Sequence, residues 1–429
     1  MKIHVKTYVC TFNQADSDAI IKRLAEGLQG ARFVQSDRTA DVVIINSCSV
    51  KEATEQKILF EIKRLGLAKK PVVVCGCLAQ ATPDLVQNAN SRAVVVGTFS
   101  YDSLSAAVAA ALKGEQFART GRGKELPLVV ARDGAVARVQ ICRGCLGSCS
   151  YCSTKLARGG LASHPIKEIV RQVEKAVFGG AREVQLTAQD TGCYGFDLEP
   201  GRDLADLLGA VCAIEGDFRV RVGMMNPEHA LKILSRLLKA FENQKVYKFL
   251  HLPVQSGSDD VLKQMRREYS AKDFLKVVRA FRKKFPGLTL ATDVIVGFPT
   301  EAGKDFEETA ALVRRIRPEV CNVSKYSSRP KTPAHKLRQL PNLQVKRRSE
   351  VLSALCRRIS LESNEKMVGS ERSVLFTGKT AAGISGRAEN YKPVSIPAAD
   401  AARHRLKPGD FALVKITGAG PSHLKAVVL

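Results

Sequence analysis

The sequence lacks the features of membrane and repeat proteins. It contains none of the runs of roughly 18 apolar residues that a transmembrane helix needs. Its first residues, MKIHVKTYVC, are typical of a strand and lack the charged and then apolar pattern of a signal peptide. No internal repeat or low-complexity tract is evident. We therefore expect a globular, cytoplasmic protein with no membrane partner.

Acidic residues are scarce relative to basic ones. The chain has 42 Asp and Glu against 67 Lys and Arg, which gives a net charge of +25. Such an excess creates a long-range positive field, and a nucleic acid fits that field better than an acidic small molecule does. Basic clusters occur at RAFRKKF, QVKRR and CRRIS, where some side chains are expected to contact phosphates. An RNA or DNA is therefore the expected large partner.

The length and the strand pattern predict an α/β protein of several domains. A chain of 429 residues exceeds what one hydrophobic core usually organises. Residues 1–112 contain Val- and Ile-rich runs (IHVKTY, DVVIIN, PVVVCG, AVVVG) separated by helical patterns, which predicts an N-terminal α/β domain with a parallel sheet. Residues 113–134 are polar and basic and predict a linker.

Residues 135–366 repeat the strand and helix alternation, at ARVQI, EVQLTA, FRVRVGM, KFLHLPV, LTLATDVIVG and EVCNVSKY. This pattern fits an open doubly wound sheet or a barrel. A cysteine run and the segments QDTG, MMNP, VQSGS and VGFP each follow a strand, so they converge at one mouth if the strands form a partial TIM-like barrel. We favour that barrel. Residues 367–429 have short strands broken by Gly and Pro and predict a small antiparallel β-barrel.

Three cysteines in the segment RGCLGSCSYCSTKLARGG have the spacing C-x3-C-x2-C: Cys145, Cys149 and Cys152. Together with Cys142 they are compatible with a four-thiolate zinc knot, although zinc sites prefer separated pairs. The alternative is a [4Fe-4S] cluster held by three ligands, with its fourth iron free to bind a substrate or cofactor. We favour the iron-sulfur interpretation, in which Cys142 is a spare buried thiol.

Three further cysteines, Cys10, Cys48 and Cys77, each lie just after a predicted N-terminal strand. Such positions meet at one edge of a parallel sheet, so the three thiolates are placed to hold a second cluster. Three unrelated core cysteines are the other interpretation. Of the remaining cysteines, Cys212, Cys321 and Cys356 are expected in the core, and Cys75 and Cys193 receive no role.

The segments TYVCTFNQADS, NSCSVKEATEQK, CGCLAQ and GCLGSCSYCSTKLARG, with the C-terminal barrel, resemble the radical S-adenosylmethionine (SAM) methylthiotransferases over essentially the whole chain. The resemblance implies that Cys145, Cys149 and Cys152 hold a SAM-binding [4Fe-4S] cluster. It also implies that Cys10, Cys48 and Cys77 hold an auxiliary [4Fe-4S] cluster that carries the sulfur to be inserted. The C-terminal part resembles the RNA-binding TRAM domain, with GRAENYKPVSI as its best match.

The same resemblance implies a SAM pocket and a substrate. Residues at matching positions of the pocket are Gln189, Asp190, Gln255, Ser256, Arg267 and Gly297, although Asp190 alternatively caps the turn that follows it. The segments QDTGCYG, GMMNP and NVSKYSSRPKTPAHKL resemble the archaeal and eukaryotic group that converts N6-threonylcarbamoyladenosine 37 of tRNA to its 2-methylthio derivative. Lys325 and Arg329 are expected to meet the tRNA or the threonyl carboxylate, unless they form an exposed loop without contacts.

Other functions remain open at this point. Relatives in the same family modify isopentenyladenosine 37 or an aspartate of a ribosomal protein, and a non-catalytic RNA-binding protein with structural metal sites is a third alternative. The family resemblance further implies an electron donor such as ferredoxin or flavodoxin and a source of sulfur as partners.

Overall fold

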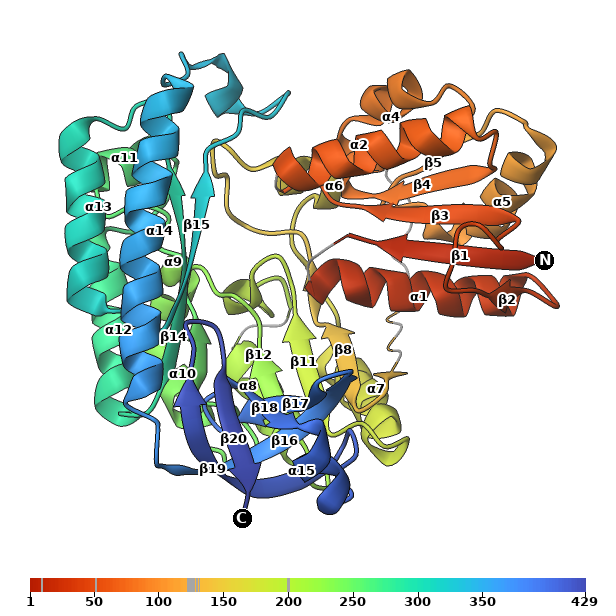
Figure 1. Cartoon of the computed structure of the whole chain (residues 1–429). Helices are drawn as coiled ribbons and strands as arrows, with labels where there is room; N and C mark the ends of the chain where they lie inside the picture. Colours follow the sequence, from red (N-terminus) through yellow and green to blue (C-terminus); the bar gives the residue numbers. More distant parts are fainter. Residues whose placement is uncertain (9–10, 51, 122–127, 129, 131, 199–200) are drawn as a thin grey trace.

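In the computed structural model, three β-structures follow one another along the chain (Figure 1). The structure describes the whole chain except residues 9–10, 51, 122–127, 129, 131 and 199–200. The first β-structure is an open parallel sheet, the second a set of parallel strands wrapped by helices, and the third a closed barrel. The predicted α/β class with a C-terminal β-barrel is confirmed.

The N-terminal sheet has six parallel strands in the order β2-β1-β3-β4-β5-β6. Their bounds are β1 (Lys2–Thr7), β2 (Arg32–Phe33), β3 (Val42–Ser47), β4 (Val72–Gly76), β5 (Val94–Val96) and β6 (Ala118–Arg119). β6 falls within the segment expected to be a linker. Strands β3, β4 and β5 are buried along their whole length, as their continuous Val and Ile runs predict.

Helices cover both faces of this sheet. Helices α1 (Thr11–Gly27) and α5 (Leu104–Lys113) pack on one face, against residues such as Ile44 and Val73. On the opposite face α2 (Glu52–Leu67), α3 (Cys77–Ala81) and α4 (Pro83–Ala89) pack against Val43, Ile45 and Val74. Successive strand residues thus enter alternate cores, and the carboxyl edge between the helix layers holds the cysteine loops.

The central unit has six parallel strands in two sheets. One sheet contains β8 (Val136–Gln140), β11 (Glu183–Thr187) and β12 (Arg219–Val222), with the short antiparallel β7 (Arg132–Asp133) on its edge. The other contains β13 (Phe249–His251), β14 (Thr289–Val296) and β15 (Val320–Lys325). An isolated bridge between Val220 of β12 and Val246 links the first sheet to the segment that leads into β13. These are the six strands that the sequence predicts, and they form the expected partial barrel.

Helices surround the central strands. Their bounds are α7 (Ile166–Phe178), α8 (Leu204–Cys212), α9 (Pro227–Lys232), α10 (Leu234–Ala240), α11 (Asp259–Gln264), α12 (Ala271–Lys284), α13 (Gly303–Ile316) and α14 (Asn342–Glu365). α12 shows why they form: Phe274, Val277, Val278 and Phe281 fall on one buried face. A capping box between Ser270 and Asp273 satisfies the first amides of this helix. No helix of the described residues is long and apolar enough to cross a membrane.

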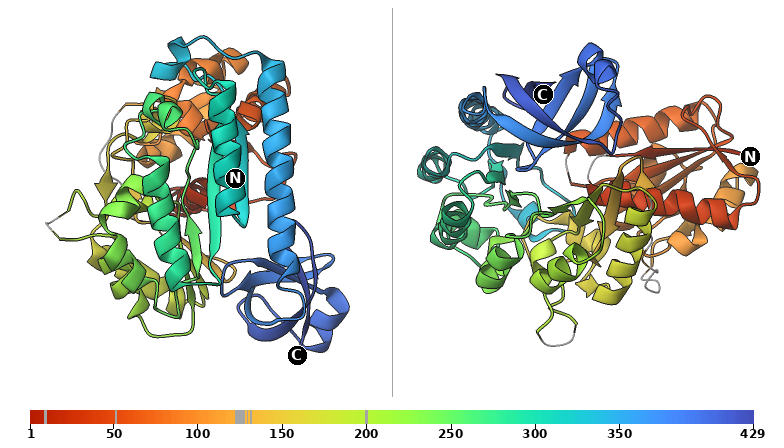
Figure 2. Two further views of the ribbon diagram at one scale, coloured as in Figure 1. Left: turned by 90° about the vertical axis from the view of Figure 1, so that its left-hand side faces the viewer. Right: turned by 90° about the horizontal axis from the view of Figure 1, so that it is seen from below.

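The C-terminal β-structure is a closed barrel in the order β16-β17-β18-β20-β19. Its strands are β16 (Glu371–Thr380), β17 (Gly383–Ala388), β18 (Pro393–Pro397), β19 (Phe411–Ala419) and β20 (Leu424–Val428), with α15 (Ala398–Arg403) between β18 and β19. Figure 2 shows α14 running along the side of the central unit down to this barrel.

Tyr391, in the turn between β17 and β18, joins the C-terminal barrel to the central strands. Its ring centroid lies 4.9 Å from those of both Tyr247 and Phe249, and its hydroxyl donates to Oε1 of Glu183 at 3.1 Å. Glu183 and Phe249 begin their strands, so the C-terminal barrel covers the amino-terminal end of the central barrel. The carboxyl ends of the central strands, on the opposite side, face the N-terminal sheet (Figure 1).

Candidate active site

The loop of Cys145, Cys149 and Cys152 lies between β9 (Cys142–Arg143) and α6 (Ser153–Arg158), above the carboxyl end of the central strands. The amide of Gly147 donates to Sγ of Cys145 at 3.3 Å. A Cβ added at Gly147 would lie 3.5 Å from Sγ of Cys145 and 3.7 Å from Sγ of Cys149. Gly147 thus lies beside two sulfurs, and its backbone amide donates to one of them, a contact that would support a thiolate.

Gly144 explains how the chain enters this loop. Its φ is 73°, and a Cβ at this position would lie 1.8 Å from the carbonyl oxygen of Gly160. Only glycine fits such a close approach of two backbone segments. Oε1 of Gln189, at the end of β11, accepts the Gly144 amide at 2.7 Å. Gln189, a predicted SAM-pocket residue, therefore positions the cysteine loop.

The charges around the loop suit a metal cluster. Burial raises the pKa of the Cys149 thiol, the Arg267 guanidinium lowers it, and the neighbouring Cys152 and Cys145 raise it again. The thiols of Cys152 and Cys145 thus act electrostatically on that of Cys149, and a bound cation would offset the charge of the three as thiolates. Three thiols on one short loop are a donor set that suits an iron-sulfur cluster.

Arg267, another predicted SAM-pocket residue, lies beside this loop. Its Nη2 donates to the hydroxyl of Tyr151 at 2.8 Å. Burial lowers the pKa of Arg267, but the nearby Tyr151, Tyr269 and Cys149 raise it more. Among the described residues, its buried Nε has no hydrogen-bond partner. A buried N–H donor without a partner is costly, so this atom fits an acceptor group of a bound ligand.

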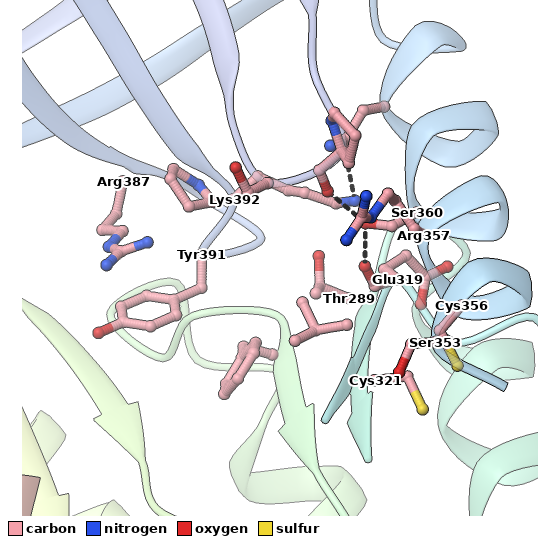
Figure 3. A pocket seen from close by; sticks show the side chains of 16 residues that line it. Thr289, Glu319, Cys321, Ser353, Cys356, Arg357, Ser360, Arg387, Tyr391 and Lys392 are labelled. Carbon is pink, nitrogen blue, oxygen red and sulfur yellow. Dashed lines mark hydrogen bonds between the residues drawn. The ribbon is translucent and has the colours of Figure 1, made fainter. Parts of the chain in front are cut away.

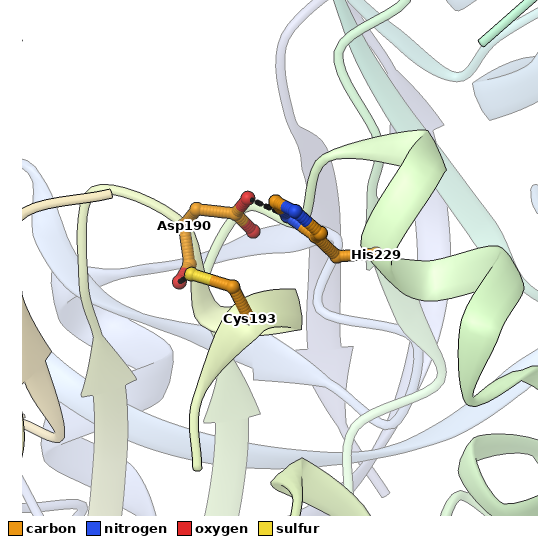
Figure 4. A group of neighbouring side chains, drawn as sticks. All are labelled: Asp190, Cys193 and His229. Atoms are coloured by element: carbon orange, nitrogen blue, oxygen red, sulfur yellow. Dashed lines mark hydrogen bonds and ion pairs between the residues drawn. The ribbon is translucent and has the colours of Figure 1, made fainter. Parts of the chain in front are cut away.

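Asp190 joins the ends of two central strands (Figure 4). Its Oδ1 accepts from the amides of Gly192 at 2.9 Å and Asn226 at 3.0 Å, and its Oδ2 lies 2.6 Å from Nδ1 of His229. Asp190, Cys193 and His229 are close enough to form a metal-binding group. Both carboxylate oxygens of Asp190 already have protein partners, however, so this aspartate caps the turn after β11 and fixes it to α9.

Cys193 is a residue to which the sequence assigns no role. Its Sγ lies 3.3 Å from the carbonyl oxygen of Asp190, and it is fully buried. A hydrogen bond between the thiols of Cys193 and Cys145, followed by burial, raises the pKa of Cys145. A hydrogen bond with the thiol of Cys142 in turn raises the pKa of Cys193. The cysteine loop therefore rests on Cys193, a contact that no local spacing in the sequence signals.

Three other predicted SAM-pocket residues form turns at the ends of β13 and β14. Gln255 has a φ of 68° and is 7% exposed. The Ser256 hydroxyl lies 3.3 Å from that of Thr309. A Cβ at Gly297 would lie 2.6 Å from the methyl carbons of Val345 on α14. Ser256 and Gly297 are thus packed against surrounding helices, and they shape the turns of the mouth.

The two predicted substrate residues lie at or beyond the end of β15 and differ in exposure. Lys325 ends the strand and is exposed. Arg329 is only 6% exposed: its Nη1 pairs with Oε1 of Glu55 at 2.8 Å, and its Nη2 donates to the carbonyl of Val50 at 3.4 Å. Arg329 therefore ties the central unit to the N-terminal segment that follows Cys48.

The N-terminal cysteines lie at the carboxyl edge of the first sheet. Cys48 follows β3 and Cys77 follows β4; both are buried, and they interact electrostatically. Cys10 lies outside the described residues, immediately before α1. Gly76 has a φ of 91°, and a Cβ there would lie 2.6 Å from the carbonyl oxygen of Ser47. This glycine lets the two cysteine segments approach each other.

Helix α6 connects the two groups of cysteines. It begins directly after Cys152, and its first residue, Ser153, donates to the carbonyl of Ser49 at 3.0 Å. Its last residue, Arg158, donates through Nε to Sγ of Cys77 at 3.3 Å and through Nη2 to Asp16. One short helix thus touches both N-terminal cysteine segments and starts at a cysteine of the central loop. No motif in the sequence predicts a role for Arg158 or Asp16.

Comparisons with protein families agree with this layout. Residues 2–97 match the "Uncharacterized protein family UPF0004", residues 139–313 the Radical SAM superfamily, and residues 365–429 the TRAM domain. Among solved structures, the radical S-adenosylmethionine methyltransferase TsrM from Kitasatospora setae, with cobalamin and a [4Fe-4S] cluster bound, has a TM-score of 0.58 at 14% identity. The alignment covers 78% of this chain and 76% of TsrM, which shows a shared fold.

Curated relatives extend over the whole chain. A probable threonylcarbamoyladenosine tRNA methylthiotransferase of Pyrococcus abyssi is 41% identical over 437 residues, covering 100% of both chains. The protein of the same name from Archaeoglobus fulgidus is 42% identical and covers 92% of both. The threonylcarbamoyladenosine tRNA methylthiotransferase of Danio rerio is 36% identical, covering 88% of this chain and 69% of the fish protein. With relatives this similar along its entire length, the chain belongs to the threonylcarbamoyladenosine tRNA methylthiotransferase family.

Proposed function

We propose that this protein inserts sulfur and a methyl group at C2 of N6-threonylcarbamoyladenosine 37 in tRNA. The observation that carries the proposal is that one helix, α6, joins the two cysteine groups: it starts directly after Cys152, and its last residue, Arg158, contacts Cys77. Two cysteine groups joined in this way fit a reaction that needs two clusters. The names of the full-length relatives supply the nucleoside.

We propose Cys145, Cys149 and Cys152 as ligands of the SAM-binding [4Fe-4S] cluster, and Cys10, Cys48 and Cys77 as ligands of the auxiliary one. When bound, SAM and the two clusters would supply the 5′-deoxyadenosyl radical, the sulfur and the methyl group. The protein's own part is to hold these groups in place. The Gly147 amide supports the Cys145 sulfur, and Gln189 fixes the backbone of the loop through Gly144.

The pocket residues divide into two kinds in this proposal. Arg267 offers its unpartnered Nε to an acceptor group of SAM, with Tyr151 fixing the plane of the guanidinium. Asp190, Ser256, Gln255 and Gly297 shape the turns around it. Lys325 is exposed at the end of β15 and is the better placed of the two basic residues to meet the tRNA, whereas Arg329 holds the N-terminal segment beside Cys48.

We further propose four segments with separate tasks. Residues 1–112 form the domain that carries the auxiliary cluster, and residues 113–134 link it to the next domain. Residues 135–366 form the radical SAM domain that binds SAM, and residues 367–429 form a TRAM domain that binds RNA. A low-potential electron carrier such as ferredoxin or flavodoxin and a sulfur source complete the set of partners, and we propose a cytoplasmic location. The net charge of +25 supports the tRNA as a polyanionic substrate.

Nucleoside analysis tests this function. Protein reconstituted with iron and sulfide under anaerobic conditions is incubated with SAM, a reductant and tRNA that carries either threonylcarbamoyladenosine or isopentenyladenosine. We expect the 2-methylthio product only from the first tRNA. Turnover of the isopentenyl substrate alone, or of a ribosomal protein and no tRNA, would overturn the proposal. Bound zinc without acid-labile sulfide would instead favour a structural role for the cysteines.

A further inference from the structure

A cavity of about 470 Å³ lies at the junction of the C-terminal barrel and the central unit (Figure 3). Its wall includes Phe249 and Thr289 at the starts of β13 and β14, Arg357 on α14, and Tyr391 with Lys392 in the turn before β18. These strand starts are at the opposite end from the cysteine loop. The cavity is therefore separate from the candidate active site.

Lys392 is a buried cation that forms no ion pair with any residue that the structure describes. It is 3% exposed, and its Nζ donates to Oδ1 of Asn364 and lies 3.5 Å from Oγ of Ser363, both neutral groups. No carboxylate of the described residues lies within ion-pair distance of it. A buried ammonium group without a counter-charge is costly, so an anion beside Lys392 would stabilise the protein.

The rest of the wall adds positive charge. Arg357 and Arg387 line the cavity, and neither forms an ion pair with any described residue. The carboxylate in the wall, Glu319, is already bonded to Arg282 at 3.1 Å and to the Leu290 amide at 2.8 Å. Three cations therefore face the cavity while its carboxylate is engaged elsewhere.

The wall also offers a hydroxyl and aromatic surface. Oγ1 of Thr289 is buried at the cavity and has no hydrogen-bond partner in the described part of the chain. The Arg387 guanidinium lies 4.7 Å from the ring centroid of Tyr391, and Phe249 adds a second ring. Cations and a donor hydroxyl recognise a phosphoryl group, and the stacked guanidinium and rings suit a flat base.

We propose that this cavity binds a phosphoryl group carried by a nucleotide unit. We assign this nucleotide unit to the tRNA, an assignment that rests on the proposed function. A free mononucleotide offers the same phosphoryl group and base and is the other source of this ligand. Lys392 and Arg357 contact the phosphoryl oxygens, Thr289 donates its hydroxyl to one of them, and the base lies against Tyr391 and Arg387.

Two measurements on the full-length protein test the proposal. Thermal unfolding is recorded with inorganic phosphate, with AMP and with chloride at equal ionic strength. Binding of unmodified tRNA is measured over a salt series. The variants are Lys392→Gln, Thr289→Val and Arg357→Gln. The control is Lys22→Gln, which removes the same charge from an exposed position on α1. Arg357 is exposed, so its variant keeps the test valid if Lys392→Gln fails to fold.

We expect phosphate and AMP to raise the unfolding temperature of the wild type and of Lys22→Gln but not of Lys392→Gln. If the source is tRNA, the slope of log K against log salt falls by about one in Lys392→Gln or Arg357→Gln, as for the loss of one phosphate contact. Stabilisation by AMP with an unchanged tRNA slope assigns the cavity to a free nucleotide. The absence of both effects overturns the proposal. The nucleoside assay of the wild type reports separately on the proposed function.

Discussion

Nε of Arg158 lies 3.3 Å from Sγ of Cys77, although the two residues are 81 positions apart. Arg158 is 2% exposed, and its Nη2 pairs with Asp16. Burial lowers the pKa of Arg158, but Asp16 and Cys77 raise it more, so the guanidinium remains charged. A permanent cation thus sits against a cysteine that we assign to the auxiliary cluster.

Replacing Arg158 by Met is expected to lower the free energy of unfolding by about 3–5 kcal/mol, because it leaves the buried carboxylate of Asp16 without its partner. The bound iron should fall from about eight to about four atoms per chain, since the Cys77 thiolate loses its donor. Denaturant unfolding and iron analysis measure the two effects.

The double variant Arg158→Met with Asp16→Asn separates these effects. It restores neutrality but not the bond to Cys77, so stability should recover in part while the iron content stays low. Wild-type iron in either variant would contradict a role of Arg158 at the auxiliary site.

Replacing Cys149 by Ala should abolish the reductive cleavage of SAM, because a methyl group cannot replace a thiolate ligand. Formation of 5′-deoxyadenosine under reducing conditions is the readout. Cys212→Ala is the matched control, because Cys212 lies on α8, away from the loop. Cleavage at a wild-type rate in Cys149→Ala would show that the loop does not bind the SAM cluster.

Gly144 and Gly160 make a second matched pair. A Cβ at Gly144 would lie 1.8 Å from the Gly160 carbonyl oxygen, whereas a Cβ at Gly160 would meet no atom within 4 Å. Gly144→Ala should therefore destabilise the protein by more than about 2 kcal/mol and weaken cluster binding, and Gly160→Ala should cost less than about 1 kcal/mol. Thermal unfolding and iron analysis measure the two effects. Equal unfolding temperatures and equal iron contents in the two variants would argue against this backbone contact.

Arg267→Met should weaken SAM binding about tenfold or more, because it removes the buried Nε that has no partner among the described residues. Equilibrium dialysis of SAM against the reconstituted protein gives the dissociation constant. Arg266→Met removes the same charge from the adjacent, exposed residue and should bind SAM normally. Equal dissociation constants for the two variants would remove Arg267 from the SAM pocket.

Lys392 gives stability a dependence on pH. Burial lowers its pKa to about 8 from 10.5, against the opposing effect of Glu319. Between these values the unfolded chain binds the proton that the folded chain has lost, so stability attributable to Lys392 rises with pH. Below about pH 8 both states carry the proton, and the burial penalty is present in full.

The difference in unfolding free energy between wild type and Lys392→Gln isolates this effect. The other ionisable groups around the cavity (Glu319, Arg357, Arg387, the phenol of Tyr391 and the thiols of Cys321 and Cys356) are present in both proteins. The free energy of unfolding of the wild type should rise relative to that of the variant between about pH 8 and about pH 10.5. A difference independent of pH would mean that the ammonium group is not buried.

Much of the fold was predictable because long apolar runs carry a clear period. The strands β3 and β14 show this well, since each contains a run of mostly apolar residues, VVII in β3 and VIV at the end of β14. The strands β2 and β6 were missed, because two residues cannot display a pattern. β20 was also missed, since its alternating LKAVV follows a Gly- and Pro-rich turn.

The candidate site divides in the same way. The spacing of Cys145, Cys149 and Cys152 is a local pattern, so the sequence alone is enough to predict a cluster there. The contacts of Arg158 with Asp16 and of Arg329 with Glu55 join distant segments, and a basic residue at a helix end or in a polar loop has the same sequence signal whether it is buried or exposed. Such pairings depend on how the N-terminal sheet docks on the barrel.

Helix α6 also determines the order in which parts of the protein fold and dock. During synthesis strands β1 to β5 are made well before residue 158, so the segments of Cys48 and Cys77 can begin to fold without the guanidinium that contacts Cys77. That contact forms only when the cysteine loop and α6 have been made and have docked on the sheet. Completion of the N-terminal cysteine site is therefore coupled to the folding of the central barrel, and a nascent chain that stops short of α6 presents that site unfinished.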